Sequence, residues 1–497
     1  MSQLFRTKNI DQLIADSNDP GKRLAKTLGP WSLAALGVGA VIGSGIFILT
    51  GTAAAGEVRS FESIFHAPLL DIFLNGSNSL GRVGRPGAGP GIALSFILVA
   101  VACSFAALCY AELASMIPIA GSAYTYAYAT LGEIFAWIIG WDLILEYAVS
   151  NMAVAVGFSA YFNDILHVLF GVTLPPQLSQ PMIAAGQFTG SWFNLPAALI
   201  LGVLTILLVR GVRESAGANN VMVVVKIAAI LIFVVGAARA VNSENWHPFM
   251  PNGFPGVLTG AAIVFFTYIG FDSVSTAAEE CKNPQRDLPF GIIVSLVVCT
   301  LLYVSVALTL TGIANWKTLN NAAPVANALK ALGFDSIRKW VDFGALVGMI
   351  SSLLVFQYGQ ARVWFAMSRD GLLPDAFARI HPRFQTPHIS TIAAGFAVGL
   401  PAGIWDIGTF ADLSNIGTLF AFILVSAGVI RLRKTQPDRL RGFRVPLVPY
   451  LPIFSIVCCL ILMTSLPLET WVRFFVWLVI GLTIYYFYGR HRTAGRA

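Results

Sequence analysis

Long apolar segments recur along the whole chain, and this feature limits its fold more than any other. A helix that crosses a bilayer needs about 20 mostly apolar residues, and segments of that size follow one another from residue 31 to residue 488. The chain is 56% hydrophobic and only 11% charged, whereas soluble domains carry roughly 25% charged residues. Backbone polar groups inside lipid must be paired within the protein, which favours helices. The sequence therefore predicts an all-α polytopic membrane protein.

The length of the chain allows about 12 transmembrane helices. We expect them at residues 31–54, 92–117, 133–162, 193–210, 218–240, 255–279, 288–313, 341–368, 389–405, 409–431, 447–466 and 470–488. The first 30 residues are polar and charged and do not form a signal peptide, so the first apolar segment should direct insertion.

Basic residues predict the orientation of these helices. With the N-terminus in the cytoplasm, 22 of the 32 Lys and Arg residues fall on the cytoplasmic side and nine on the outer side, while Lys226 lies within a segment. Cytoplasmic loops carry an excess of basic residues, so both termini should be cytoplasmic. The net charge of +7 is therefore explained by membrane orientation, without nucleic acid as a partner.

The first apolar segment contains the stretch GVGAVIGSGIFILTG, which includes Gly43-Ser44-Gly45. Glycine in a helix interior costs about 1 kcal/mol relative to alanine. A break in a transmembrane helix is tolerated where it lines a cavity, and the N-terminus of the second half can then bind an anion such as a carboxylate. The alternative interpretation is close helix packing through small residues.

The sixth apolar segment shows a similar interruption. It reads GAAIVFFTYIGFDSVSTAAEE, with Gly270 in its middle and Asp272 two residues later. Interruptions in the first and sixth segments are typical of two inverted repeats of five helices each. This second interruption favours a broken helix over simple packing in the first segment.

Lys226 is the most unusual single residue. Five apolar residues precede it and nine follow. A lysine in mid-membrane costs about 2.5–3.5 kcal/mol on insertion scales, so such residues usually have a function. Burial disfavours the charged amine, which could then take up and release a proton during transport. The alternative is a side chain that extends to the cytoplasmic interface.

Other polar residues within the apolar segments give weaker signals. Asp142 and Glu146 are four residues apart and share one helix face. These two residues and Glu112 either line a pathway or form hydrogen bonds inside the bundle. The hydroxyls of Ser351 and Ser352 could bind a cation or an amine, or bond one helix to another.

Several other kinds of site find no support. The six histidines form no H-x-x-x-H pair, and there is no G-x-S-x-G motif. The Gly-rich end of the loop 56–91 is not a P-loop, because Arg82-Val83 stands where Lys-Ser/Thr is required, and we expect it to be flexible surface. We therefore expect no enzymatic activity, no metal and no cofactor.

Taken together, these motifs resemble the amino acid–polyamine–organocation (APC) superfamily, and most closely its cationic amino acid transporter branch in the bacterial form. The similarity extends from about residue 22 to residue 488. Besides the two interrupted segments, it rests on the stretches CYAELASMIPIAGSAYTYAY, GWDLILEY and KNPQRDLPFGI. The loop 56–91 is longer than expected for this family.

The resemblance implies a LeuT-like fold of two inverted five-helix repeats plus two C-terminal helices, with helices 1 and 6 broken. Its expected parts are a cytoplasmic N-terminal segment (1–30), a first repeat (31–240) that includes the outer loop 56–91, a second repeat (255–431), two additional helices (432–488) and a cytoplasmic tail (489–497).

The resemblance also implies a substrate site. The α-carboxylate of an amino acid would meet the first break at Ile42, Gly43, Ser44 and Gly45. The α-amino group would meet carbonyls at Phe266, Thr267 and Ile269, with the Phe266 ring covering the substrate. Lys226 matches the lysine of proton-coupled members, with Ser351 and Ser352 near its amine.

We therefore expect a secondary transporter that moves amino acids across the cell membrane by alternating access, with protons as the coupling ion. An exchanger or uniporter without proton coupling, a transporter-like amino acid sensor and a channel are the alternatives. Cationic, neutral and broad side-chain selectivity are all compatible with the sequence.

Overall fold

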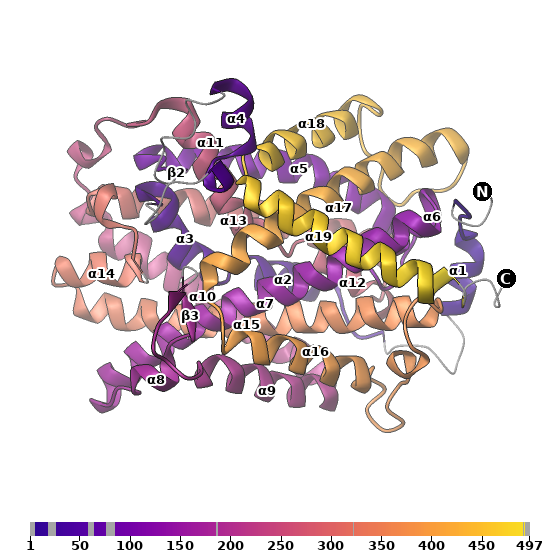
Figure 1. The fold of residues 1–497 in the computed structure, drawn as a ribbon, viewed down its shortest axis with the longest axis horizontal. Coiled ribbons are helices and arrows are strands. Elements are labelled where there is room, and N and C mark those ends of the chain that lie inside the picture. The colour runs from indigo at the N-terminus through magenta and orange to yellow at the C-terminus, as the bar shows by residue number, and fades with distance from the viewer. Residues whose placement is uncertain are drawn as a thin grey trace.

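The computed structural model describes residues 5–17, 26–57, 64–75, 85–184, 187–321, 323–490 and 492. Helices dominate it, and they pack as one elongated bundle with a continuous apolar core (Figure 1). The first helices along the chain are α1 (Ile10–Ser17), α2 (Pro30–Val41), α3 (Ser44–Ala55), α4 (Leu69–Asn75), α5 (Ile92–Met116), α6 (Ala123–Thr130), α7 (Glu133–Phe170), α8 (Pro176–Ser179), α9 (Leu195–Arg210) and α10 (Val212–Ala237).

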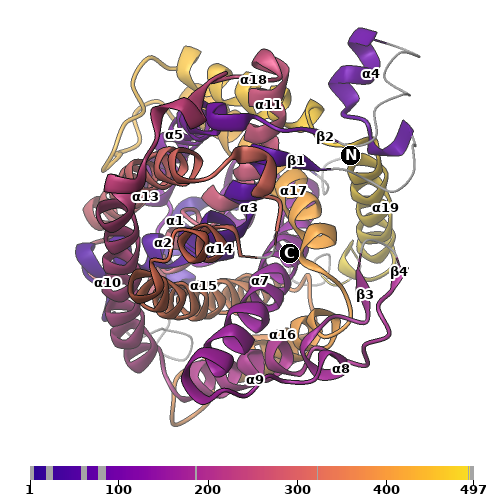
Figure 2. The same ribbon diagram turned by 90° about the vertical axis from the view of Figure 1, so that its left-hand side faces the viewer.

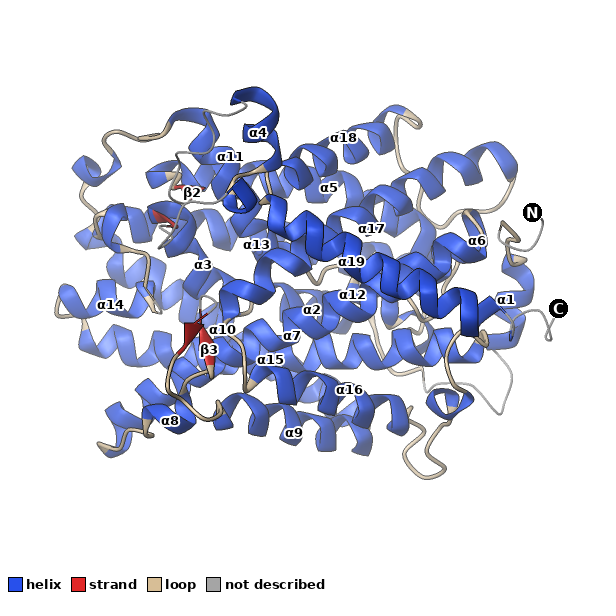
Figure 3. Cartoon of the chain, in the orientation of Figure 1, coloured by secondary structure: helices blue, strands red, loops and turns tan. Residues whose placement is uncertain are grey.

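The remaining helices are α11 (Gly253–Val264), α12 (Ser273–Thr276), α13 (Pro284–Ile313), α14 (Pro324–Ala331), α15 (Asp335–Arg369), α16 (His388–Ala402), α17 (Ile407–Thr435), α18 (Tyr450–Thr464) and α19 (Leu468–Ile484). Single helical turns are η1 (Ile64–His66), η3 (Gly89–Gly91), η4 (Ala238–Ala240), η5 (Ser243–Trp246), η6 (Phe265–Tyr268), η7 (Ala278–Glu280), η8 (Trp316–Thr318), η9 (Asp375–Ala378) and η10 (Tyr485–Gly489). In the part of the chain that the structure describes, strands form two short antiparallel pairs (Figure 3), which are β1 (Gly56–Glu57) with β2 (Arg85–Pro86) and β3 (Ile183–Ala184) with β4 (Gln187–Phe188).

Among the described residues, eight helices are long and apolar enough to cross a membrane. A ninth crossing results if the bent pair of α2 and α3 is taken as one span. Three shorter apolar helices, α9, α16 and α18, lie at the edges of the bundle in Figure 1. Proline in the first turn starts α2, α9 and α13, where its missing N–H costs nothing.

The two longest helices, α7 and α15, pack along each other. α2 lies inside the molecule, in contact with α10, α13 and α15, and α3 continues beside α7 (Figure 2). The apolar residues on the outer faces of α10, α13 and α18, such as Val224, Leu301 and Phe454, are exposed. Such outward apolar surfaces suit contact with lipid.

The loop 56–91 is more ordered than the sequence analysis predicted. It contains the helix α4, and Leu69 N donates to Leu466 O in the turn between α18 and α19. Residues 85–91, which end the Gly-rich stretch, are almost entirely buried, and Asn252 Nδ2 donates to the Gly87 carbonyl over 2.8 Å. The expected flexible surface is therefore wrong for residues 85–91, while residues 58–63 and 76–84 lie outside the described part of the chain.

Candidate functional site

The first long apolar segment forms two helices instead of one. α2 ends at Val41, α3 begins at Ser44, and the two axes are bent by 42°. Ile42 and Gly43 lie between them, and both residues are buried. Helix ends, with backbone groups that lack intrahelical partners, therefore lie inside the bundle.

The sixth apolar segment is interrupted as well. α11 ends at Val264 and continues as η6 to Tyr268, after which the chain is extended at Ile269. Gly270 has a φ of +121°, a conformation that favours glycine. The short helix α12 then begins at Ser273. The interruption lies where the sequence places its mid-segment glycine.

These two breaks lie against each other. A Cβ atom on Gly45 would be 2.7 Å from Thr267 Cγ2, and one on Gly270 would be 2.6 Å from Ala40 Cβ. Real Cβ atoms do not approach so closely, so glycine is what lets the two segments meet. The seven residues expected to bind substrate all lie in or beside the paired breaks, namely Ile42, Gly43, Ser44, Gly45, Phe266, Thr267 and Ile269.

The side chain of Lys226, on α10, reaches into the first break. Its Nζ donates to Gly39 O over 2.8 Å and to Ile42 O over 2.9 Å, and it lies 3.3 Å from Ser351 Oγ. These three partners use the three donors of an ammonium group, and none of them is a carboxylate. The residue is 0% exposed, so the amine does not extend to an interface.

The hydroxyl of the neighbouring Ser352, on α15, contacts the same end of α2. It is within 3.1 Å of the carbonyl oxygens of Gly39, Ala40 and Ile42. Ser351 and Ser352 are both 0% exposed. The structure therefore brings the predicted lysine and both predicted serines together at the carbonyl end of α2.

Two further polar residues at this site escaped the sequence analysis. The Tyr303 hydroxyl lies 2.6 Å from Val41 O and 2.8 Å from Thr267 O, so it bridges the two breaks. Asn219 Oδ1 accepts a hydrogen bond from Ser351 Oγ over 2.7 Å. Asn219 precedes Lys226 by two helical turns and lies on the same helix face. This spacing could have identified Asn219 from the sequence.

The paired breaks offer groups of both polarities. In the described part of the chain, no side chain caps the N-terminus of α3, and the buried Ser44 Oγ has no hydrogen-bond partner. A helix N-terminus attracts anions through its free N–H groups and its dipole. Carbonyl groups at the interruption beside Thr267 attract a cation. The paired breaks therefore present groups that suit an anion beside groups that suit a cation.

A sequence profile of the amino acid permease family matches residues 28–485. The chain belongs to this family. The match spans both breaks and confirms the predicted membership in the APC superfamily. The protein is accordingly a multi-pass membrane transporter and not an enzyme.

Individual relatives extend this comparison. The permease is 46% identical over 490 residues to the methylthioribose transporter of Bacillus subtilis, covering 99% of the chain and 98% of the relative. It is 46% identical over 489 residues to the branched-chain amino acid permease BcaP of the same organism, covering 98% of each. The vacuolar cationic amino acid transporter 4 of Arabidopsis thaliana is 36% identical over 444 residues, or 88% of the permease and 68% of the relative.

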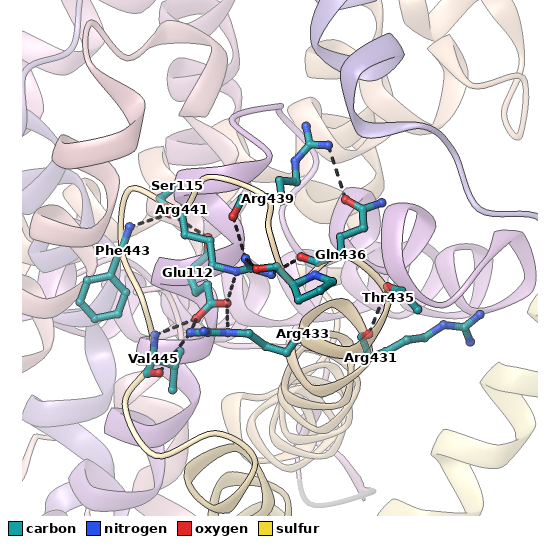
Figure 4. A network of polar contacts seen from close by, with 11 residues as sticks. Glu112, Ser115, Arg431, Arg433, Thr435, Gln436, Arg439, Arg441, Phe443 and Val445 are labelled. Carbon is teal, nitrogen blue, oxygen red and sulfur yellow. Dashed lines mark hydrogen bonds and ion pairs between the residues drawn. The ribbon is translucent and has the colours of Figure 1, made fainter.

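Both carboxylate oxygens of Glu112 accept hydrogen bonds. The donors are Arg433 at 2.8 and 2.7 Å, Arg441 at 3.1 Å and Val445 N at 2.7 Å (Figure 4). These bonds fasten the end of α5 to α17 and to the loop that follows it. For Glu112, the structure supports the interpretation of bonding inside the bundle.

The carboxylates of Asp142 and Glu146, unlike that of Glu112, are not hydrogen-bonded to the described part of the protein. The two residues are 3% and 2% exposed. Asp272, which follows the second break, is 1% exposed and accepts one hydrogen bond, from Tyr147 Oη over 2.9 Å. Internal hydrogen bonding therefore does not account for the pair on α7.

Ion pairs hold the permease together at the end where α1 lies. Arg362 pairs with Glu280 at 2.9 Å, and Arg369 pairs with Glu279 at the same distance. Leu28 N also donates to Glu280 O over 3.0 Å. These contacts join α15, the chain before α2 and the end of the sixth apolar segment.

Proposed function

We propose that this permease is a secondary active transporter of amino acids that works by alternating access. The observation that carries the proposal is the contact between the two breaks, at Gly45 and Thr267. The uncapped N-terminus of α3 suits an α-carboxylate, and the nearby carbonyls suit an α-ammonium group. The Phe266 ring would cover the bound substrate.

The proposed site extends to the residues expected from the sequence. Ile42, Gly43, Ser44 and Gly45 would bind the carboxylate, and Phe266, Thr267 and Ile269 the amino group. A carbonyl oxygen has two lone pairs, so Thr267 O can accept from an ammonium group while Tyr303 Oη contacts it.

We infer that the architecture consists of about 12 spans in two inverted repeats, 31–240 and 255–431, followed by two helices within 432–488. The short helices α9, α16 and α18 would each cross the membrane in this arrangement. Interruptions in the first span of each proposed repeat support it. We place the segment 1–30 and the tail 489–497 in the cytoplasm, in line with the distribution of basic residues and with α1 and the end of α19 lying at one end of the bundle (Figure 1).

Lys226 would couple transport to protons. Its amine stabilises the carbonyl end of α2 while it is charged, through Gly39 O and Ile42 O. Loss of its proton would remove one donor and weaken the hold on this end of α2. Ser351 and Ser352 would remain as hydroxyl partners of the same carbonyls and of the amine. Proton binding would thereby change the shape of the substrate site.

The names of the relatives suggest two candidate substrates. Two proteins with 46% identity are named for branched-chain amino acids and for methylthioribose. A site with an anion-binding and a cation-binding end fits a zwitterion better than an uncharged sugar. We therefore propose an amino acid as the cargo and methylthioribose as the second candidate.

Uptake into liposomes tests this proposal. The purified full-length permease is reconstituted, and the uptake of labelled leucine, lysine and methylthioribose is followed with and without an inward proton gradient. We expect an amino acid to accumulate only with the gradient, and a protonophore to abolish the accumulation. Exchange against internal amino acid without a gradient would favour an exchanger, equilibration alone a uniporter, and binding without uptake a sensor.

A further inference from the structure

Three buried carboxylates, Asp142, Glu146 and Asp272, form a second group of ionisable side chains in the bundle. Glu146 lies one helical turn from Asp142 on α7 and interacts electrostatically with Asp272 across the bundle. None of the three is more than 3% exposed. We call this group the acidic cluster.

Most of the oxygen atoms in the acidic cluster have no partner. Both oxygens of Asp142, both of Glu146 and one of Asp272 accept no hydrogen bond among the described residues. The Thr418 hydroxyl on α17 lies near Glu146, but it donates to Ser414 O over 3.0 Å. The buried carboxylate of Glu112, by contrast, is hydrogen-bonded at both oxygens.

An independent observation points into the same space. The Tyr110 hydroxyl on α5 is 0% exposed and has no hydrogen-bond partner in the described chain, although it lies near both Asp272 and Glu146. Buried hydroxyl groups are nearly always hydrogen-bonded, and an exception requires an explanation. The unbonded Tyr110 hydroxyl and the unbonded carboxyl oxygens therefore lie near one another in the bundle, and the contacts of the described residues do not account for either.

No Lys or Arg of the described chain is among the groups that act on the three carboxylates. Among the described residues, the titratable groups that interact with the acidic cluster are Cys103 and Tyr110 on α5, Tyr126 on α6 and Tyr147 on α7. Glu146 interacts with both of the other carboxylates, and three such buried groups cannot all be ionised without a counter-charge, because like charges repel and are poorly solvated there. The described residues contain no group of three side chains arranged to hold a metal ion.

We propose that the acidic cluster is a second proton-binding site, separate from Lys226. A proton taken from the aqueous phase converts one carboxylate into a neutral carboxylic acid, and its new O–H then donates to a neighbouring carboxylate oxygen. The proton leaves by the reverse step, so no other reactant is needed. This assignment explains why so many oxygens lack donors from the protein.

The two proton-binding sites would act on the same short piece of α2. Lys226 holds the carbonyls of Gly39 and Ile42 from one side. Gly270, two residues before Asp272, packs against Ala40 from the other side. A change of charge at either site therefore alters the support of one helix end.

Infrared difference spectroscopy on the full-length permease in liposomes tests the proposal. Spectra recorded at acidic and alkaline pH distinguish the C=O stretch of a protonated carboxyl group from the bands of a carboxylate. We expect a titrating carboxyl band that Glu146→Gln removes and Tyr110→Phe shifts, since the second variant keeps the ring and deletes only the hydroxyl. Glu244→Gln, at an exposed position, is the matched control and should leave the band unchanged.

Two results would overturn the assignment. One is a carboxyl band that is identical in the unmodified permease, Glu146→Gln and Tyr110→Phe. The other is loss of the band when sodium replaces choline at constant pH, which would identify the occupant as a metal cation. No substrate is present in the experiment, so a failure of amino acid uptake would leave its outcome unaffected.

Discussion

The Nζ atom of Lys226 lies 2.8 Å from the carbonyl oxygen of Gly39, in the last turn of α2. This bond joins a fully buried amine to the helix end that borders the proposed substrate site. A charged donor strengthens such a hydrogen bond, so the charge of Lys226 and the position of this helix end depend on each other.

Replacing Lys226 should uncouple transport from protons. We expect Lys226→Ala to reduce proton-driven amino acid uptake to the level of protein-free liposomes, because the carbonyls of Gly39 and Ile42 lose their charged partner. Lys330→Ala, at an exposed position on α14, should transport normally. Uptake by Lys226→Ala that still responds to pH would rule out this lysine as the coupling residue.

A large side chain in the first break should prevent substrate binding. A Cβ on Gly43 would lie 2.8 Å from Ser352 Oγ, so Gly43→Leu must displace the hydroxyl or fill the space at the break. We expect binding of labelled leucine to weaken by at least about tenfold, which corresponds to 1.4 kcal/mol. Gly202→Leu is the control, because no atom lies within 4 Å of a Cβ at that helix position. Unchanged affinity in Gly43→Leu would argue against the proposed site.

Removing Glu112 should destabilise the whole protein. Glu112→Ala leaves Arg441, whose side chain is 0% exposed, without its carboxylate, and also deprives Arg433 of a partner. Breaking a buried ion pair from one side typically costs about 3–5 kcal/mol. Asp11→Ala, in an exposed pair with Arg439, should cost under about 1 kcal/mol. Thermal unfolding in detergent measures both, and equal melting temperatures would contradict the expectation.

Cys281 should report on opening at the end of the bundle where α1 lies. Burial raises the pKa of its thiol to about 11, from 9.0. Only the thiolate reacts with maleimides, so at neutral pH the reactive fraction is about a hundredfold lower than for an ordinary cysteine. We expect slow labelling, in a variant with the other cysteines replaced, that accelerates as the pH rises towards 11.

Labelling of Cys281 should also become faster when Leu28 separates from Glu280 and Lys282. Backbone hydrogen bonds to Glu280 and Lys282 hold Leu28 on both sides of the cysteine. Conditions that open this end should therefore increase the labelling rate at constant pH. A rate that is fast at neutral pH in the resting protein would show that the thiol is not enclosed.

Sequence alone predicted the features that depend on local composition. The apolar segments located the helices, and glycine next to polar residues located the interruptions near Gly43 and Gly270. Lys226 stood out because a charge within an apolar helix is costly. These properties belong to single segments and need no knowledge of how segments pack.

Partners that are distant in the chain could not be predicted in this way. Glu112 bonds to Arg433 and Arg441, more than 300 residues later, and nothing near Glu112 in the sequence indicates which basic residues it meets. The order within the loop 56–91 has a similar origin, because Leu69 is held by Leu466. Such pairs are fixed only when the helices pack together.

Tyr303, on α13, contacts both interrupted segments. Its hydroxyl contacts Val41 at the end of one and Thr267 at the turn of the other, so neither can tilt away from α13 without breaking that contact. During any conformational change of this protein, we expect the end of α2, the turn at Thr267 and α13 to move together as one rigid body. Relative motion should then occur between this body and the helices around it.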